Sequence, residues 1–458
     1  MHDRTTRRAV LAALGAGTLA GCLDANGDDV NGDEPTPTDT STSDHPEYDH
    51  PEPSDDPDWR PAEGSPLDAD VEVEVLVENL EVPWDIAFGG DDLFITERTG
   101  RVLRLDNGEV AAVAEPADAI DAGAVHPDDE DTSPWWVAGG EGGTMGVATH
   151  PEYPDPSYVY VYYTAEADDE IVNRLARYDV SADDPADTRE VLLDDVPAHN
   201  IHNGGRIAFG PDDNLWVLTG DASEEDSDDI TNPRDPASLA GKVLRLTPDG
   251  HPAPDNPDFG DDADPRVFTI GHRNPQGIDW LPSGVPVITE HGPQARDEVS
   301  VLTPGGDYGW VDARGGPDDD SYGNYAESDF VPPLVNTGPG TTWAPSGATF
   351  YTGNAVPEWE NRFLVGGLIS QTIFVVTIAP NAADEPTADG GERYDEEWMD
   401  DAYQVTAHQV LDGELGRVRH VAQSPDGDLY AITSNRDGRA AGDFPTDRDD
   451  VLVRITST

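Results

Sequence analysis

Several side chains that could remove a proton or bind an anion stand just ahead of apolar, strand-like segments. They are His202, Arg273, Arg417 and Arg419. Arginine presents a planar fork that binds carboxylates through two hydrogen bonds, so arginines gathered at one site indicate an anionic ligand. A histidine with a carboxylate nearby, such as Asp221, has the chemistry of a general base. Taken singly, each could equally be a structural histidine or an arginine in an ordinary salt bridge.

Further polar groups occupy related places ahead of, or at the ends of, apolar segments: Glu141, Asn274, Gln276 and Glu290. Shortly after Glu290 the chain turns at Gly292-Pro293, and the backbone carbonyls of this turn would face the same region. Carbonyl oxygens beside an anionic ligand form the kind of site that a hard cation such as calcium binds.

The elements that must position these residues recur six times. In each repeat a short apolar segment runs into a turn and then into a second apolar segment. The repeats are about 60 to 70 residues apart, too long for one hairpin but long enough for a four-stranded sheet with its loops. Aligning the first apolar segments gives one central residue per repeat: Ile86, Val147, Ile207, Ile278, Ala348 and Val421.

Six four-stranded antiparallel blades around an axis form a β-propeller, so we predict an all-β, six-bladed propeller over residues 67–458. Turn residues, such as those at 424–427, stand between first and second strands as hairpins require. Residues 71–75 alternate apolar and charged side chains, which predicts an outer strand of the last blade beside residues 451–455. Such closure would hide the free strand edges.

In a propeller the first strand of each blade lies nearest the axis, so residues just ahead of it surround one mouth of the central channel. The residues at this place are Glu81, Glu141, His202, Arg273, Trp343 and Arg417. A second ring, from the ends of the second strands, contains Glu97, Asp221 and Glu290. Their shared position favours a functional site over a collection of unrelated structural residues.

The composition is strongly acidic. Among 458 residues, 94 Asp and Glu oppose 26 Lys and Arg, the formal net charge is -68, and Lys242 is the only lysine. Such a chain repels itself at low ionic strength, whereas a screening length of roughly 3 Å at molar salt removes the repulsion. We therefore predict a surface adapted to concentrated salt. Nucleic-acid binding is disfavoured because no basic stripe is available to neutralise phosphates.

Residues 1–22 are typical of an export signal. Arg7-Arg8 precede a short apolar run, and Leu19-Ala20-Gly21 precede Cys22, the only cysteine. Twin arginines indicate export in the folded state, and the cysteine is where a lipoprotein signal is cleaved and lipidated. About 12 apolar residues are too few to cross a hydrocarbon core of roughly 30 Å. We expect export by the twin-arginine route and a lipid anchor on the outer face of the cell membrane.

Residues 23–66 are rich in Asp, Pro, Thr, Ser and Glu and contain almost no aromatic residues. A segment of this composition cannot bury enough apolar surface to fold. We predict a disordered acidic tether between the lipid anchor and the propeller.

At the predicted site the sequence resembles the soluble aldose sugar dehydrogenases that use pyrroloquinoline quinone (PQQ), the relatives of soluble glucose dehydrogenase. The similarity covers all six predicted blades in the same order. Each motif alone is weak, but the ordered set is specific. The matching segments are Gly142–Pro151, His202–Pro211, Thr219–Asp221, Gly271–Gly277, Glu290–Pro293, Asp297-Glu298, Asp307–Trp310, Ala344–Gly347 and Gly416–Arg419.

The resemblance implies oxidation of an aldose sugar to a lactone, with a hydride passing to PQQ and electrons then passing to an unidentified acceptor. It implies that His202 is the general base, that Asp221 is its carboxylate partner, and that Arg273 stabilises negative charge on the quinone oxygen. The residues that it places against the cofactor are Glu141, Asn274, Gln276, Arg417 and Arg419.

The resemblance also implies two calcium ions. The carbonyls of Gly292 and Pro293 would hold one that contacts the cofactor and acts as a Lewis acid. The second, structural ion would lie at Glu298, the Tyr308 carbonyl and Asp318.

Three residues depart from the family pattern. Ile369 stands where some members have a lysine that reaches the cofactor, and Glu141 stands where glucose dehydrogenase has a glutamine. Ile201 precedes the histidine where some relatives have an acidic residue.

Two other functions remain open on the sequence alone, because propellers host many functions. A calcium-dependent lactonase would need side-chain carboxylate and asparagine ligands at the axis, and it would leave Arg417 and Arg419 without a role. A non-catalytic propeller that binds glycans or proteins would be compatible with the absence of a lysine at position 369.

Overall fold

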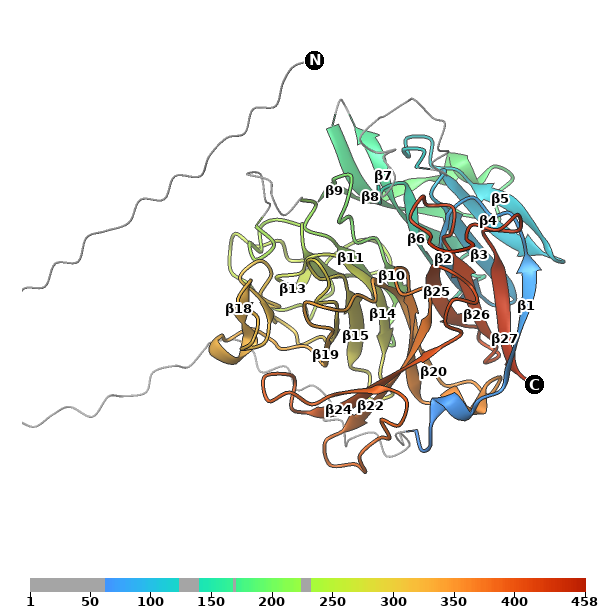
Figure 1. The fold of residues 1–458 in the computed structure, drawn as a ribbon. Helices are drawn as coiled ribbons and strands as arrows, with labels where there is room; N and C mark the ends of the chain where they lie inside the picture. Colours follow the sequence, from blue (N-terminus) through green and yellow to red (C-terminus); the bar gives the residue numbers. More distant parts are fainter. Residues whose placement is uncertain (1–61, 123–139, 168–169, 224–231) are drawn as a thin grey trace, which may run out of the picture. The chain divides into compact units, whose positions relative to one another are not determined.

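The computed structural model describes residues 62–122, 140–167, 170–223 and 232–458 (Figure 1). Within these residues the chain forms six antiparallel sheets, and the first strands of neighbouring sheets contact each other in a closed ring. This arrangement is a six-bladed β-propeller of four-stranded blades, so the predicted fold is confirmed. Residues 1–61, which include the predicted export signal and most of the predicted tether, lie outside the described residues.

The first three blades follow the chain in simple order. The first contains β2 (Pro83–Gly89), β3 (Asp92–Glu97), β4 (Arg101–Asp106) and β5 (Glu109–Ala114). The second contains β6 (Thr144–Thr149), β7 (Tyr158–Ala167), β8 (Glu170–Asp179) and β9 (Glu190–Pro197). The third contains β10 (Ile207–Phe209), β11 (Leu215–Thr219), β12 (Lys242–Leu246) and β13 (Val267–Ile270).

The last three blades carry additions to the simple order. The fourth contains β14 (Pro275–Trp280), β15 (Pro286–Glu290), β16 (Glu298–Val301) and β19 (Val335–Asn336). The fifth contains β20 (Pro345–Tyr351), β21 (Arg362–Gly367), β22 (Ile373–Pro380), β24 (Tyr403–Val410) and the extra edge strand β23 (Glu392–Tyr394). The sixth contains β25 (Val418–Gln423), β26 (Leu429–Thr433), β27 (Leu452–Ser457) and β1 (Val71–Val77).

An excursion between β16 and β19 adds a separate two-stranded parallel sheet of β17 (Ala313–Gly315) and β18 (Gly323–Asn324). Four 3₁₀ helices are described: η1 (Pro66–Asp68), η3 (Pro185–Thr188), η4 (Tyr325–Glu327) and η5 (Pro357–Trp359). Over the ranges that the structure covers, no helix is long and apolar enough to cross a membrane.

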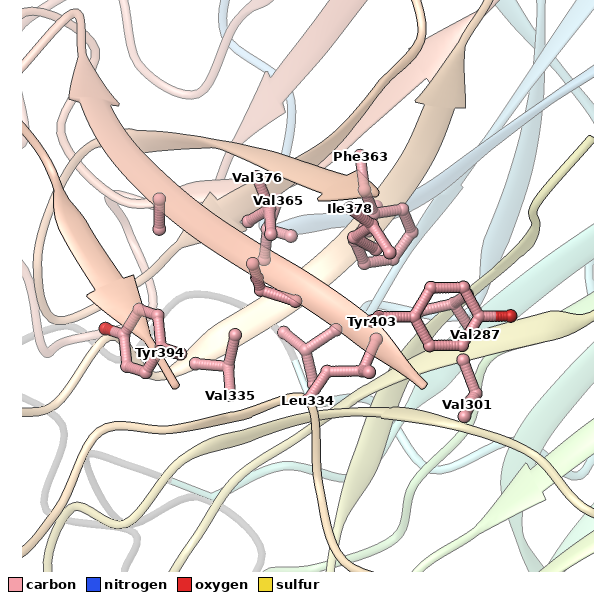
Figure 2. Packing of buried hydrophobic residues seen from close by; sticks show 14 of the residues in the cluster. Val287, Val301, Leu334, Val335, Phe363, Val365, Val376, Ile378, Tyr394 and Tyr403 are labelled. Carbon is pink, nitrogen blue, oxygen red and sulfur yellow. The ribbon is translucent and has the colours of Figure 1, made fainter. Parts of the chain in front are cut away.

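The core lies between neighbouring blades. Because both faces of a blade are covered, several strands read as continuous apolar runs, as in β11, where all five residues are buried. Figure 2 shows one cluster, in which Val287 and Val301 of the fourth blade pack with Phe363 and Val376 of the fifth. Each side chain of this size contributes roughly 1.5–3 kcal/mol when it is fully buried. The propeller therefore gains its stability from the contacts between blades.

The sixth blade closes the ring with strands from both ends of the propeller sequence. β1 pairs antiparallel with β27, with Val73 opposite Ile455 and Val75 opposite Val453. The valines of β1 pack against the buried cluster between the fifth and sixth blades, and the glutamates between them face outward. The predicted closing strand is therefore confirmed.

The ordered contacts begin before β1. The indole N–H of Trp359 donates to the Pro66 carbonyl at 3.0 Å, and Arg362 donates to the Gly64 carbonyl at 2.9 Å. Residues 62–66, which we assigned to the tether, thus contact the fifth blade.

Removal of residues 62–77 is expected to lower the thermal unfolding midpoint, because β27 would lose its partner and expose both a strand edge and an apolar face. Thermal unfolding and size-exclusion chromatography in molar salt would measure this, with a chain that lacks only residues 1–61 as the control. Equal midpoints for the two shortened chains would contradict a closing role for β1.

Candidate active site

A cleft of about 500 Å³ lies where the first strands of the second to fifth blades begin. Its volume is within the range of small-molecule sites. The titratable side chains that line it are those of Glu141, His202, Arg273, His291, Asp297 and Arg439. Ile369 also lines the cleft and is 58% exposed, so an apolar side chain stands at its rim.

The histidine and aspartate predicted to act together are in contact. His202 Nδ1 lies 3.0 Å from Asp221 Oδ1, and both side chains are buried. A carboxylate at Nδ1 favours the tautomer that carries its proton there, which leaves Nε2 free to accept one. The His202 backbone N–H donates to Glu141 Oε2 at 2.8 Å, so a second carboxylate holds the main chain.

Gly220, directly after the last residue of β11, lets the chain pass close to His202. A Cβ atom at position 220 would lie 1.9 Å from the His202 carbonyl oxygen. Only glycine therefore allows the end of β11 to pass close enough for Asp221 to reach the His202 ring.

Trp310 contacts both Asp221 of this pair and Arg273. Its indole N–H donates to Asp221 Oδ2 at 2.7 Å, and its ring lies 5.5 Å from the guanidinium carbon of Arg273, within range of a cation–π interaction. The Arg273 Nη1 group donates to the His291 carbonyl at 3.2 Å. One buried indole thus contacts both the partner of the expected base and the expected electrophilic arginine.

Glu290 fixes the main chain at Arg273. Its Oε1 accepts from the Arg273 backbone N–H at 2.8 Å and from Arg314 Nη2 at 2.6 Å, and its Oε2 contacts His272 Nδ1 at 2.8 Å. Burial raises the pKa of Glu290, but Arg314 and His272 outweigh burial and lower it to about 2. The carboxylate therefore stays ionised throughout the physiological pH range.

Glu141 is also held in its ionised form. Its Oε2 accepts from Asn274 Nδ2 at 3.1 Å, and its Oε1 lies 3.5 Å from Arg439. Burial raises the pKa of Glu141, but Arg439, His202 and His291 outweigh burial and hold it well below its usual range. Arg439 thus offsets the negative charge of Glu141, the residue that stands where the resemblance implies a glutamine in glucose dehydrogenase.

Arg417 and Arg419 are buried and are not among the residues that line the cleft. Arg417 donates twice to Asp437 Oδ2, at 3.0 and 2.7 Å, and once to the Leu368 carbonyl at 3.1 Å. Arg419 donates to Gln276 Oε1 at 2.8 Å, and its Nε has no hydrogen-bond partner among the described residues. Burial lowers the pKa of Arg419 to about 9. Arg417 is therefore neutralised by Asp437, whereas the Nε–H group of Arg419 is a buried donor that could bind a ligand.

Sequence reasoning missed several residues of the site. Asp437 and Arg439 follow the second strand of the sixth blade as Asp221 follows that of the third, so the same positional rule would have found them. Trp343, which we counted in the ring, is buried and stacks on Phe374 with ring centroids 3.9 Å apart, so it belongs to the core.

The turn at Gly292-Pro293 retains oxygen donors. Gly292 lines the cleft, and the Pro293 carbonyl accepts from Arg296 Nη1 at 3.1 Å. A carbonyl oxygen has two lone pairs, so this contact leaves Pro293 one acceptor position. Asp297 holds the turn, since its Oδ1 accepts from the Gly292 N–H at 3.0 Å. Backbone carbonyl oxygens are the donor type that calcium binds, although at Pro293 the Arg296 guanidinium takes one of the two acceptor positions.

The second predicted calcium set does not fit. Glu298 Oε2 lies 2.7 Å from Arg314 Nη1, and the Tyr308 carbonyl accepts from the Tyr325 hydroxyl at 3.2 Å. Asp318 is exposed, and its neighbour Asp319 pairs with Arg296 instead. Within the ranges that the structure describes, no group of three or more His, Cys, Asp or Glu side chains could hold a metal ion.

The fold and the site define a propeller enzyme whose channel mouth combines a histidine–carboxylate pair with buried arginines. A family model described as "Glucose / Sorbosone dehydrogenase" matches residues 80–442. The chain belongs to this family of PQQ-dependent sugar dehydrogenases, which confirms the resemblance seen in the sequence.

Individual relatives agree with this assignment. The chain is 28% identical to quinoprotein glucose dehydrogenase B of Acinetobacter calcoaceticus, over 79% of this chain and 84% of that protein. A crystal structure of a glucose dehydrogenase-like oxidoreductase from Thermus thermophilus has a TM-score of 0.65 and 34% identity, covering 84% of this chain and all of the other. The PQQ-bound aldose sugar dehydrogenase of Streptomyces coelicolor has a TM-score of 0.62 and 27% identity, covering 85% and 99%.

Replacement of Trp310 by Phe is expected to lower kcat by about ten-fold or more, because it removes an N–H donor to a buried carboxylate, a hydrogen bond of roughly 1.5–3 kcal/mol. Steady-state kinetics would measure the loss. Trp216→Phe is the matched control, since Trp216 is a buried tryptophan whose Nε1 has no hydrogen-bond partner among the described residues. Equal kcat values for the two variants would show that the Asp221 contact has no catalytic importance.

Proposed function

We propose that the protein oxidises aldose sugars to lactones by transferring a hydride to PQQ. The observation that carries this proposal is the concentration of arginine beside the His202–Asp221 pair, which exceeds the charge that Asp437 and Glu141 offset. In a chain with only 26 Lys and Arg against 94 Asp and Glu, five arginines gather around one mouth: Arg98, Arg273, Arg417, Arg419 and Arg439. Such a concentration supports an anionic ligand at this place.

The donor chemistry of the mouth fits PQQ, which carries carboxylates and quinone oxygens. Arg419 Nε and His291 Nε2 are buried donors or acceptors without a hydrogen-bond partner among the described residues, and a buried polar group gains by finding one. Arg419, with Arg417 behind it, would hold cofactor carboxylates. Asn274, Gln276 and Glu141 would stand at its edge, as the sequence predicted.

The chain's own residues would then divide the work of oxidation. His202 Nε2 accepts the proton of the sugar hydroxyl while a hydride leaves the carbon that bears this hydroxyl. The carbonyl of the lactone forms at that carbon. Asp221, in contact with Nδ1, stabilises the imidazolium that results. Arg273 places a positive charge where negative charge develops on the electron-accepting group. PQQ, when bound, supplies a two-electron acceptor for the hydride.

We also propose that calcium binds at the Gly292 and Pro293 carbonyls, where it would act as a Lewis acid beside the cofactor. The support is that Gly292 lines the cleft and that the Pro293 carbonyl beside it keeps one acceptor position.

For the cellular setting we propose export by the twin-arginine route, a lipid anchor at Cys22 and activity in concentrated salt. The support is the N-terminal sequence and the net charge of -68. The electron acceptor stays unidentified.

Dye-linked oxidation of aldoses in molar salt would test the reaction, with and without added PQQ and calcium. His202→Ala is expected to lower activity at least a hundred-fold, because general-base catalysis contributes typically 10²–10⁴-fold, and to retain the cofactor. His251→Ala, at an exposed histidine, is the matched control. Absence of both activity and bound quinone would instead favour a binding propeller, and lactone hydrolysis would favour a lactonase.

Replacement of Cys22 by Ser is expected to move the protein from the membrane fraction to the soluble exported fraction, because the lipid attachment site is lost. Fractionation of cells that express each form would measure this. Equal membrane retention of the two forms would contradict the anchor.

A further inference from the structure

Two buried glutamates face each other beneath the active site. Glu290 and Glu298 are directly opposite in the antiparallel pair β15–β16, and their side chains are only 3% and 2% exposed. Like charges at directly opposed positions of a sheet are destabilising, and buried charges require a partner. The two strands can therefore pair while both carboxylates are ionised only if a cation lies between them.

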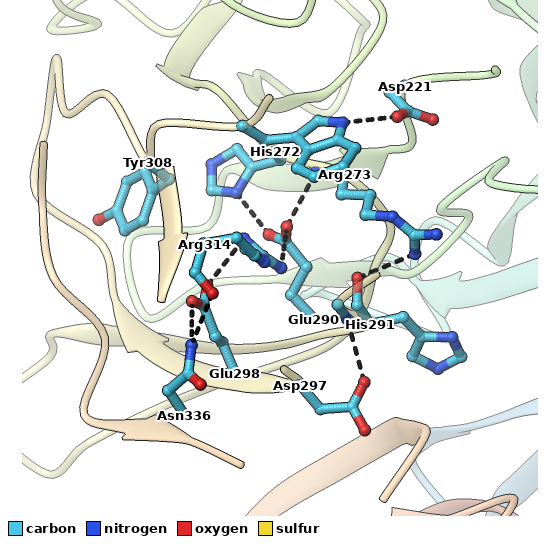
Figure 3. A network of polar contacts seen from close by, with 12 residues as sticks. Asp221, His272, Arg273, Glu290, His291, Asp297, Glu298, Tyr308, Arg314 and Asn336 are labelled. Carbon is cyan, nitrogen blue, oxygen red and sulfur yellow. Dashed lines mark hydrogen bonds and ion pairs between the residues drawn. The ribbon is translucent and has the colours of Figure 1, made fainter. Parts of the chain in front are cut away.

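Arg314 supplies that cation. Its side chain is fully buried, with Nη2 lying 2.6 Å from Glu290 Oε1 and Nη1 lying 2.7 Å from Glu298 Oε2 (Figure 3). The guanidinium thus donates a hydrogen bond to Glu290 and forms an ion pair with Glu298 on the neighbouring strand. β17, which carries Arg314, belongs to the excursion between β16 and β19, so the chain inserts this residue from outside the regular blade.

We propose that Arg314 is a built-in structural cation that takes the place of the second calcium ion implied by the family resemblance. The integrity of the fourth blade beneath the site then does not depend on a metal at Glu298. This inference concerns the framework and stands whether or not the proposed reaction is correct.

The remaining contacts of Glu298 agree with a guanidinium rather than a metal. Its Oε1 accepts from Asn336 Nδ2 at 2.9 Å, and it lies 3.1 Å from the Tyr325 hydroxyl, whose single hydrogen is shared with the Tyr308 carbonyl 3.2 Å away. Calcium needs six to eight oxygen atoms that offer lone pairs, whereas the groups around this carboxylate are hydrogen donors. The second carboxylate, Glu290, is likewise used by Arg314, His272 and the Arg273 N–H.

One guanidinium serves two carboxylates, since Arg314 contacts Glu290 through Nη2 and Glu298 through Nη1. Loss of the guanidinium would leave both carboxylates buried without a cation, in a space that a small cation could enter.

The test is thermal unfolding of the cofactor-free, full-length protein in constant molar salt, with EGTA or with millimolar calcium. The wild-type midpoint is expected to be the same in both. Arg314→Ala is expected to lower the midpoint by about 5 °C or more in EGTA, since breaking a buried ion pair is strongly destabilising, and to regain part of the loss in calcium. Arg454→Ala, at an exposed ion pair with Glu74, is the matched control and should change neither value.

Glu298→Gln separates the two calcium positions. Calcium stabilisation of the wild type that disappears in Glu298→Gln would place the ion at Glu298 and overturn the proposal. Calcium stabilisation that persists in Glu298→Gln would come from an ion at another position and would agree with the proposal. If Arg314→Ala does not fold, Arg314→Lys replaces it, because lysine keeps the charge without the planar fork. A midpoint for Arg314→Lys that is lower than that of the wild type but independent of calcium supports the proposal. A midpoint that rises with calcium only while Glu298 is present contradicts it.

Discussion

The buried carboxylate of Glu290 connects the propeller framework to the active site. It ends the second strand of the fourth blade, and it accepts hydrogen bonds from Arg314 of the excursion and from the Arg273 backbone at the channel mouth. An ionised carboxylate in the interior is tolerated only when several donors surround it. The requirement to satisfy Glu290 therefore fixes where the excursion packs and where the Arg273 main chain lies.

The same excursion serves the site twice. Trp310 donates to Asp221, which contacts the His202 ring. Arg314, four residues further along the chain, donates to Glu290. The base partner and the arginine are thus both held by a segment that is absent from the regular four-stranded pattern. A site built this way is rigid because each functional side chain is positioned by another buried side chain.

Charge is distributed unevenly in this protein. The net charge of -68 is spread over the chain, yet the arginines gather where carboxylates are buried. At the mouth, Asp437 neutralises Arg417 and Arg439 balances Glu141, so the positive charge left for a ligand is smaller than the number of arginines suggests. With Ile369 at the rim instead of a lysine, Arg419 and Arg273 become the principal groups that could attract an anionic cofactor. Concentrated salt would screen the surface more than these buried groups.

The sequence by itself determined the fold and the principal residues of the site, but not the contributions of Trp310, Asp437 and Arg439. Six apolar repeats of a length suited to four strands predicted the propeller, and alternation in residues 71–75 predicted its closing strand, because both signals are local and periodic. The position of His202, Arg273 and Asp221 relative to their strands placed them at one mouth.

What only the tertiary structure decided was the pairing of charges. Whether Arg417 faces a ligand or Asp437, and whether Glu298 faces calcium or Arg314, depends on residues far apart in sequence. Such contacts leave no periodic trace along the chain, and the charge balance of a buried group is settled only when all its neighbours are in place.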